Sequence, residues 1–129
     1  MRRIILAALL LAASATGALA GYVTNYSDWK QKSPFAQSQY AMGLLDGQML
    51  TNAGDKIAIA RSDGLDKCAY ALGLTGEMIA EAITRYYQDH TDIWGASPMV
   101  PFQIVIVKGA CLEYVNTERA KYSLPPWTK

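Results

Sequence analysis

The sequence predicts an all-α protein, a small bundle of three to four main helices stapled by one disulfide bond. Two Ser-Pro pairs, at 33–34 and 97–98, are typical of helix starts. The serine accepts hydrogen bonds from free amides, and a proline at the first helical position loses no backbone bond. Between the two pairs, Thr75 precedes a segment with amphipathic spacing. The two cysteines of the chain flank that segment.

The first 20 residues predict a secretory signal peptide. Arg2 and Arg3 precede an unbroken apolar run at 4–13, and Ala18 and Ala20 are small residues where a signal peptidase recognises its substrate. An N-terminal membrane anchor is the alternative, but the run is shorter than the roughly 20 residues that span a bilayer. We expect cleavage after Ala20, a periplasmic location in a Gram-negative cell and no membrane-embedded segment afterwards.

Cleavage leaves 109 residues, the size of one domain, with ten basic and eleven acidic side chains and a formal charge of −1. Such a surface has no basic block, so we expect no nucleic-acid partner. A domain this small gains much from a covalent link.

Cys68 and Cys111 are the only cysteines, and an oxidising compartment favours a disulfide between them. Two free buried thiols or a redox pair are the alternatives, although no CxxC spacing is present. Closing a loop of this length stabilises a protein by about 4 kcal/mol in the chain-entropy treatment.

Residues 21–34 have no clear period and predict an irregular lead-in or a frayed first turn. The helical domain is expected to span 35–120, and its first helix covers about four turns from Phe35. The residues expected on one face of this helix are Ala36, Tyr40, Gly43, Leu44, Gly47 and Leu50. Its glycines would allow another helix to approach closely. Alternatively, Asp46-Gly47 is a turn that ends a shorter helix.

Thr51 to Asp66 is polar and contains glycine near both ends, which predicts a loop. Its apolar centre, 57–60, is too short to decide between a helical turn and an edge strand.

Thr75 predicts the cap of a helix that stops near His90. Its apolar stripe consists of Met78, Ile79, Ala82, Ile83 and Tyr86, and Glu81 and Arg85 form a surface pair one turn apart.

After Pro98 the chain predicts another helix. Read alone, Phe102 to Val107 is rich in β-branched residues and is compatible with a strand. Helical spacing instead aligns one continuous face, and the nearby prolines favour a helix. That face consists of Val100, Ile104, Val107, Cys111, Leu112 and Val115. Pro125-Pro126 ends any helix, so 121–129 is expected to be an extended tail.

Several motifs together resemble a known family. They are Tyr40-x-x-Gly43-x-x-x-Gly47, Cys68, Leu74-Thr75, Arg85-Tyr86-Tyr87 and the Pro98 helix that runs into Cys111. From about Phe35 to Tyr114 the chain resembles the Rap/Tai-type periplasmic immunity proteins, which protect Gram-negative bacteria against type VI secretion amidase effectors.

The resemblance implies an all-helical domain, often a homodimer, that plugs the active-site cleft of a secreted peptidoglycan amidase. The protruding segment would be the connector 89–97 or the loop 51–66. Trp94 is the expected anchor, with Asp89 and Asp92 beside it, because aromatic residues dominate interface hot spots. The alternative is that Trp94 covers the end of the core.

Catalysis finds little support in the sequence. His90 is the only histidine and has no HxxxH partner, so we expect neither a catalytic residue nor a metal or other cofactor. Asp63, Asp66, Asp89 and Asp92 are interpreted as solvated loop acids. Two other hypotheses stay open: a periplasmic stress chaperone, and a structural or assembly factor without inhibitory activity.

Overall fold

Every regular element that the structure describes is helical. The structure is a computed structural model that describes residues 23–129, so the predicted signal peptide and its cleavage site lie outside the described residues. No strand occurs within 23–129. The all-α prediction is therefore confirmed for this part of the chain.

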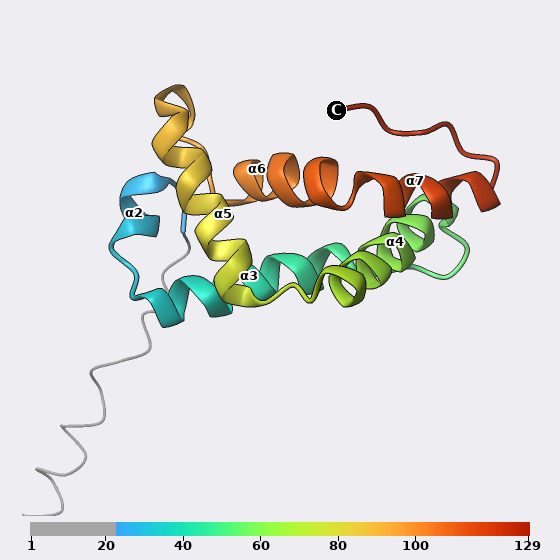
Figure 1. Cartoon of the computed structure of the whole chain (residues 1–129), viewed down its shortest axis with the longest axis horizontal. Coiled ribbons are helices and arrows are strands. Elements are labelled where there is room, and N and C mark those ends of the chain that lie inside the picture. The colour runs from blue at the N-terminus through green and yellow to red at the C-terminus, as the bar shows by residue number, and fades with distance from the viewer. Residues whose placement is uncertain (1–22) are drawn as a thin grey trace, which may run out of the picture.

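Residues 23–129 contain six α-helices, one 3-10 turn and one π-helix, joined by short connectors and followed by a tail. They are α2 (Tyr26–Lys30), α3 (Pro34–Gln48), α4 (Lys56–Leu72), α5 (Gly76–Asp89), η1 (Thr91–Ile93), α6 (Met99–Phe102), η2 (Gln103–Ala110, the π-helix) and α7 (Leu112–Lys121). In Figure 1, α6, η2 and α7 follow one another as one long rod, α3 and α4 run along the opposite side, and α5 crosses at one end. α3 packs most extensively on α5, and α4 on α7.

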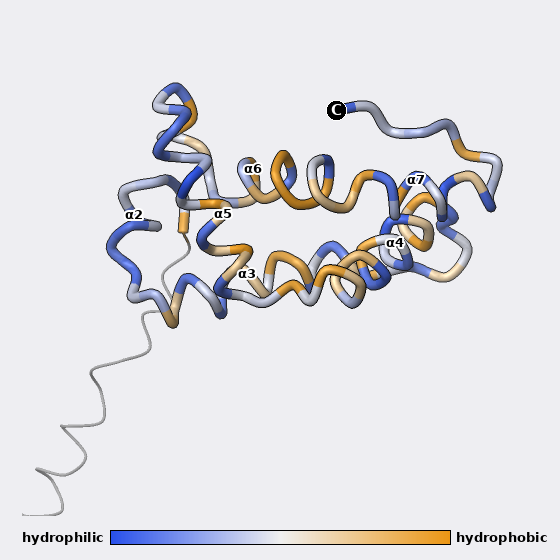
Figure 2. Tube along the Cα trace, viewed as in Figure 1, coloured by the Kyte–Doolittle hydropathy of each residue, from blue (hydrophilic) through white to orange (hydrophobic). Residues whose placement is uncertain are grey.

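The core lies between these layers. Hydrophobic residues gather along α3, α4 and the α6–η2 segment, whereas α2 is mostly hydrophilic (Figure 2). The largest fully buried side chains include Trp29, Tyr87, Phe102, Leu65, Ile79 and Ile83. One contiguous apolar cluster therefore connects every helix from α2 to α7.

The capping residues begin two helices where the sequence predicted them. The Ser33 hydroxyl accepts a hydrogen bond from the amide of Ala36 over 3.2 Å, directly before Pro34. The Thr75 hydroxyl accepts one from the amide of Met78 over 3.2 Å. Because a cap needs only local atoms, both signals were readable in the sequence.

The lead-in is not wholly irregular, since α2 lies within it. Asn25 caps this helix by accepting from the amide of Asp28, and the Trp29 side chain is fully buried. The Trp29 indole nitrogen donates to the Thr84 hydroxyl of α5 over 2.9 Å. A contact across 55 residues therefore orders this segment, and no local pattern announces it.

The loop predicted for Thr51 to Asp66 is wrong beyond Asp55, because α4 begins there. The Asp55 carboxylate accepts from the amides of Ile57 and Ala58, and Gly73, with a φ of 59°, ends the helix. Gly64 lies inside α4 because α7 crosses directly over it: a Cβ at Gly64 would sit 2.5 Å from the Cα of Val115. Tertiary packing overrides the poor helix propensity of glycine.

The glycines of α3 do not mediate the close approach expected of them. A Cβ at Gly43 or Gly47 would meet nothing within 4 Å, and the helix passes through Asp46-Gly47 to end at Gln48. The buried residues of α3 are Ala41, Leu44 and Leu45. Of the expected face, Leu50 is 74% exposed. The close contact to α3 is made instead at Gly76 of α5, where a Cβ would lie 2.5 Å from the Ser38 hydroxyl oxygen.

The segment Phe102 to Val107 is helical, so the strand alternative is wrong. However, Val100 and Ile104, expected on the inner face, are 37% and 40% exposed, while Phe102 and Ile106 are buried. Within the π-helix, the i→i+5 hydrogen bonds change the spacing at which residues share a face, so Ile106 rather than Ile104 lies in the core with Val107 and Cys111.

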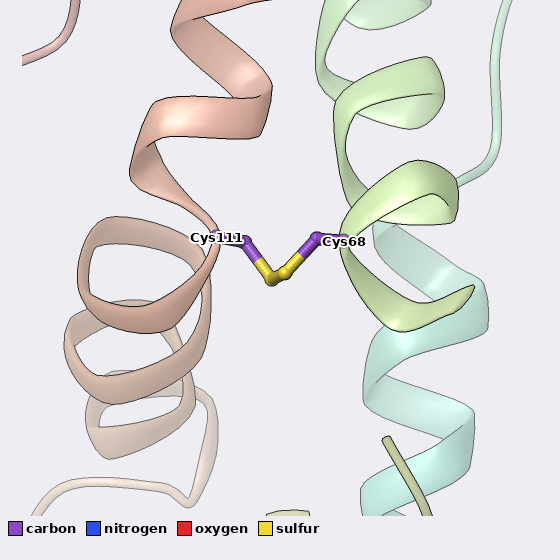
Figure 3. Close-up of a disulfide and its surroundings, with 2 residues drawn as sticks. All are labelled: Cys68 and Cys111. Carbon is purple, nitrogen blue, oxygen red and sulfur yellow. A yellow bond between two sulfur atoms is a disulfide. The ribbon is translucent and has the colours of Figure 1, made fainter. Parts of the chain in front are cut away.

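The disulfide between Cys68 and Cys111 is present, with a Cα–Cα distance of 5.4 Å. The two side chains point toward one another between α4 and the junction of η2 with α7 (Figure 3). Cys68 lies within α4. The tail after Lys121 lacks regular structure but is held on α7, since Asn116 exchanges two hydrogen bonds with the backbone of Trp127.

Candidate functional site

The connector from His90 to Ser97 links α5 to α6 and contains η1. Figure 1 shows the end of α5 and this connector projecting at one end of the molecule. Two of the three predicted partner-binding residues, Asp92 and Trp94, lie in this connector. The third, Asp89, is the last residue of α5.

Three hydrogen bonds tie the connector to the core. The Trp94 indole nitrogen donates to the carbonyl of Tyr87 over 2.7 Å, and the Tyr87 hydroxyl donates to the carbonyl of Ala96 over 2.7 Å. The amide of Tyr26 donates to the carbonyl of Trp94 over 2.9 Å. Burial raises the pKa of the Tyr87 phenol above its usual range, so the hydroxyl stays a donor at physiological pH. The connector is therefore preorganised.

Trp94 covers the end of the core and also presents a surface. Its ring lies 5.3 Å from that of Tyr26, which stacks on Tyr87 at 4.8 Å. Trp94 nevertheless remains 47% exposed. The sequence did not identify Tyr26 as the residue that supports Trp94. The aromatic residues of the lead-in were the available signal for such a contact.

Asp89 and Asp92 are both exposed. Asp89 ends α5 and Asp92 lies in η1, two residues before Trp94. Neither takes part in an ion pair among the described residues. The structure therefore groups Asp92 with Trp94, and places Asp89 at the base of the connector.

An open groove of about 390 Å³ adjoins the connector along α5. Its lining residues are Met78, Glu81, Ala82, Arg85, Tyr86, Asp89 and Val105. The predicted pair between Glu81 and Arg85 forms on its rim. The Tyr86 ring stacks on His90 at 3.9 Å, and the His90 Nδ1 donates to the Tyr86 carbonyl over 2.9 Å.

Within 23–129, no group of three or more His, Cys, Asp or Glu side chains could hold a metal ion. Both cysteines are in the disulfide, so neither offers a free thiol. None of the described helices has the length and apolar character needed to cross a membrane. The exposed features at this end of the molecule are a half-exposed aromatic ring, two carboxylates and a groove lined by both apolar and charged side chains.

The chain matches no known protein family, no curated protein and no solved structure.

Proposed function

We propose that this protein is a secreted periplasmic inhibitor that binds a peptidoglycan amidase and occludes its active-site cleft with the connector 90–97. The observation that carries the proposal is the preorganised, half-exposed Trp94 on a projecting segment. A rigid aromatic anchor loses little conformational entropy on binding, which is why such residues are common hot spots. The sequence resemblance to type VI amidase immunity proteins supplies the class of partner, and the predicted signal peptide, with cleavage expected after Ala20, supports the periplasmic location.

The test is inhibition of secreted peptidoglycan amidases, beginning with any that is encoded beside this protein's gene. We expect stoichiometric binding and loss of peptidoglycan hydrolysis. Trp94→Ala should weaken binding by about 30-fold or more, the effect of losing a hot-spot residue. Tyr70→Ala is the matched control, because Tyr70 is an exposed aromatic residue on α4 and should change nothing.

Asp92→Lys separates recognition from folding. Asp92 is exposed and takes part in no ion pair among the described residues, so the variant should keep its thermal stability while binding more weakly. A wild-type protein that neither binds nor inhibits the amidase would sink the proposal.

The proposal includes a homodimer formed through the outer face of α5. Glu81 and Arg85 lie one turn apart on that face, so two antiparallel copies can exchange these charges across a two-fold axis. Sedimentation equilibrium should give twice the monomer mass. Arg85→Glu should shift the protein toward monomer, and the swapped Glu81→Arg/Arg85→Glu variant should restore the dimer.

An acid-stress chaperone is the second candidate, favoured by one buried carboxylate. Glu118 is 3% exposed and bridges Lys67 of α4 and Lys121 of α7. Its protonation would weaken the α4–α7 contact and open apolar surface. A protein that remains folded at about pH 2, below the ordinary carboxyl pKa range, and leaves aggregation of acid-unfolded proteins unchanged would rule this candidate out.

A further inference from the structure

The C-terminal tail, residues 122–129, reverses direction after α7 and runs back along the long rod (Figure 1). The Pro125 carbonyl accepts a hydrogen bond from the Arg119 Nε over 2.8 Å. Trp127, further along the tail, is bonded to Asn116, which lies earlier in α7. The tail is therefore an extended segment that lies antiparallel on the surface of α7.

Asn116 and Arg119 contact the tail as a protein contacts a bound peptide. The Asn116 side-chain amide donates to the Trp127 carbonyl over 3.0 Å, and its oxygen accepts from the Trp127 amide over 2.7 Å. The Arg119 guanidinium lies over the Trp127 ring, with Cζ 4.8 Å from the ring centroid. In recognition of extended peptides, main-chain bonds of this kind supply affinity and side-chain contacts supply specificity.

The tail has the features of a preorganised ligand. Pro125 and Pro126 each fix a φ angle, so the segment loses little conformational entropy when it docks. Trp127 then packs, partly buried, against the core cluster. The tail is a stiff spacer followed by an aromatic anchor.

The turn that returns the tail to its own α7 is strained. Ser123 has a φ of 55° and is the only residue other than glycine with a positive φ within 23–129. The amide of Ser123 donates to the Ala120 carbonyl over 3.0 Å, and the amide of Leu124 to the Arg119 carbonyl over 3.1 Å. Helices that end with these two bonds usually carry glycine at the left-handed position, where a Cβ is unfavourable. Returning the tail within one chain therefore has a conformational cost at Ser123.

We propose that the Asn116–Arg119 surface of α7 is a peptide-binding site and that, at high protein concentration, it exchanges its own tail for the tail of a second copy. A second copy is the occupant because every copy carries a segment whose fit to this site the structure shows. The contacts are the same within one chain and between two, so exchange loses none of them and relieves the turn at Ser123. The intramolecular form dominates in dilute solution because it needs no association. This inference does not depend on the proposed inhibitory function.

The test mixes two full-length variants, each of which lacks one half of the contact. Trp127→Ala keeps the site and loses the anchor of the tail, and Asn116→Ala keeps the tail and loses both main-chain bonds. Unlabelled Asn116→Ala is titrated into ¹⁵N-labelled Trp127→Ala, and the side-chain amide resonances of Asn116 are followed. They should shift in a saturable way with a Kd of about 1 mM or less, because the tail stays docked in one chain only if its Kd lies below the millimolar effective concentration of a short linker.

The double variant Asn116→Ala/Trp127→Ala is the matched control for the titrant. It differs only in the tail anchor and should leave the Asn116 resonances of the labelled protein unchanged. An absence of saturable shift with Asn116→Ala, or an equal shift with the double variant, would overturn the proposal.

Substitutions at Ser123 test the exchange in the protein with both halves intact. Ser123→Gly should weaken the exchanged dimer at least about tenfold, because glycine removes the strain of the left-handed turn. Ser123→Pro should strengthen it, since proline cannot adopt a φ of 55° and has no amide hydrogen for the Ala120 carbonyl. Sedimentation equilibrium measures both in the Arg85→Glu background, which removes the proposed α5 interface. Equal dimer fractions in the two folded variants would contradict the exchange. The titration uses no Ser123 variant, so it decides the question even where Ser123→Pro does not fold.

Discussion

Because Gly64 has no Cβ, α4 and α7 can pack in direct contact at this position. A Cβ there would lie 2.5 Å from the Cα and 2.8 Å from the amide nitrogen of Val115, both backbone atoms that cannot move aside cheaply. We expect Gly64→Ala to lower the free energy of unfolding by about 3 kcal/mol, as overpacking does. Gly43→Ala is the control: it has open space and should stabilise α3 by up to about 1 kcal/mol. Urea unfolding measures both, and equal effects would contradict the packing argument.

Glu118 makes stability depend on acid. The Lys121 and Lys67 ammonium groups that donate to its carboxylate hold its pKa below the ordinary value of 4.5. A lowered folded-state pKa means that this contribution is present above pH 4.5 and is lost as the pH falls through the folded value.

We therefore expect Glu118→Gln to lose less stability than the wild type between pH 6 and pH 3, about the range over which carboxyl groups titrate. The measurement is the urea midpoint at each pH. Glu113→Gln is the control, because Glu113 is exposed and takes part in no ion pair among the described residues. Parallel pH curves for wild type and Glu118→Gln would refute the assignment.

At the scale of the element, α4 depends on its cap. The Asp55 carboxylate accepts from two amides of the first turn, and the helix carries Gly64 in its interior. Asp55→Ala should cost about 1 kcal/mol. Asp63→Ala, an exposed change within the same helix, should be nearly neutral. Thermal unfolding checks the difference, and a neutral Asp55→Ala would show that tertiary contacts alone set the start of α4.

The candidate site is also a feature of one element, the connector between α5 and α6. Trp94, Asp89 and Asp92 were predicted to bind a partner through the family resemblance, and local helix signals placed them in a connector between two predicted helices. Their support was not predictable, because Tyr26 reaches Trp94 from 68 positions earlier in the chain. The orientation of Trp94 is a tertiary property, since Tyr26 and Tyr87 set it together.

At the scale of the whole molecule, the disulfide joins the two layers. It links α4 to the long rod formed by α6, η2 and α7, and closes a sequence separation of 43 residues. Reduction should lower the free energy of unfolding by about 4 kcal/mol in the chain-entropy treatment. Unfolding in urea with and without dithiothreitol measures this. A change below about 1 kcal/mol would mean that packing of α4 on α7 already restricts the unfolded chain.

Local chemistry in the sequence by itself determined the helical class, the starts at Ser33 and Thr75 and the pairing of Cys68 with Cys111. Caps need atoms only three residues away, and two cysteines allow one intrachain pairing. Only the tertiary structure decided the burial of Trp29, the helix through Gly64 and the π register of 103–110. The first two depend on partners from distant parts of the chain, Thr84 and Val115 respectively, which no sequence window contains. The third depends on the hydrogen-bonding register of the whole segment, which its apolar pattern did not predict.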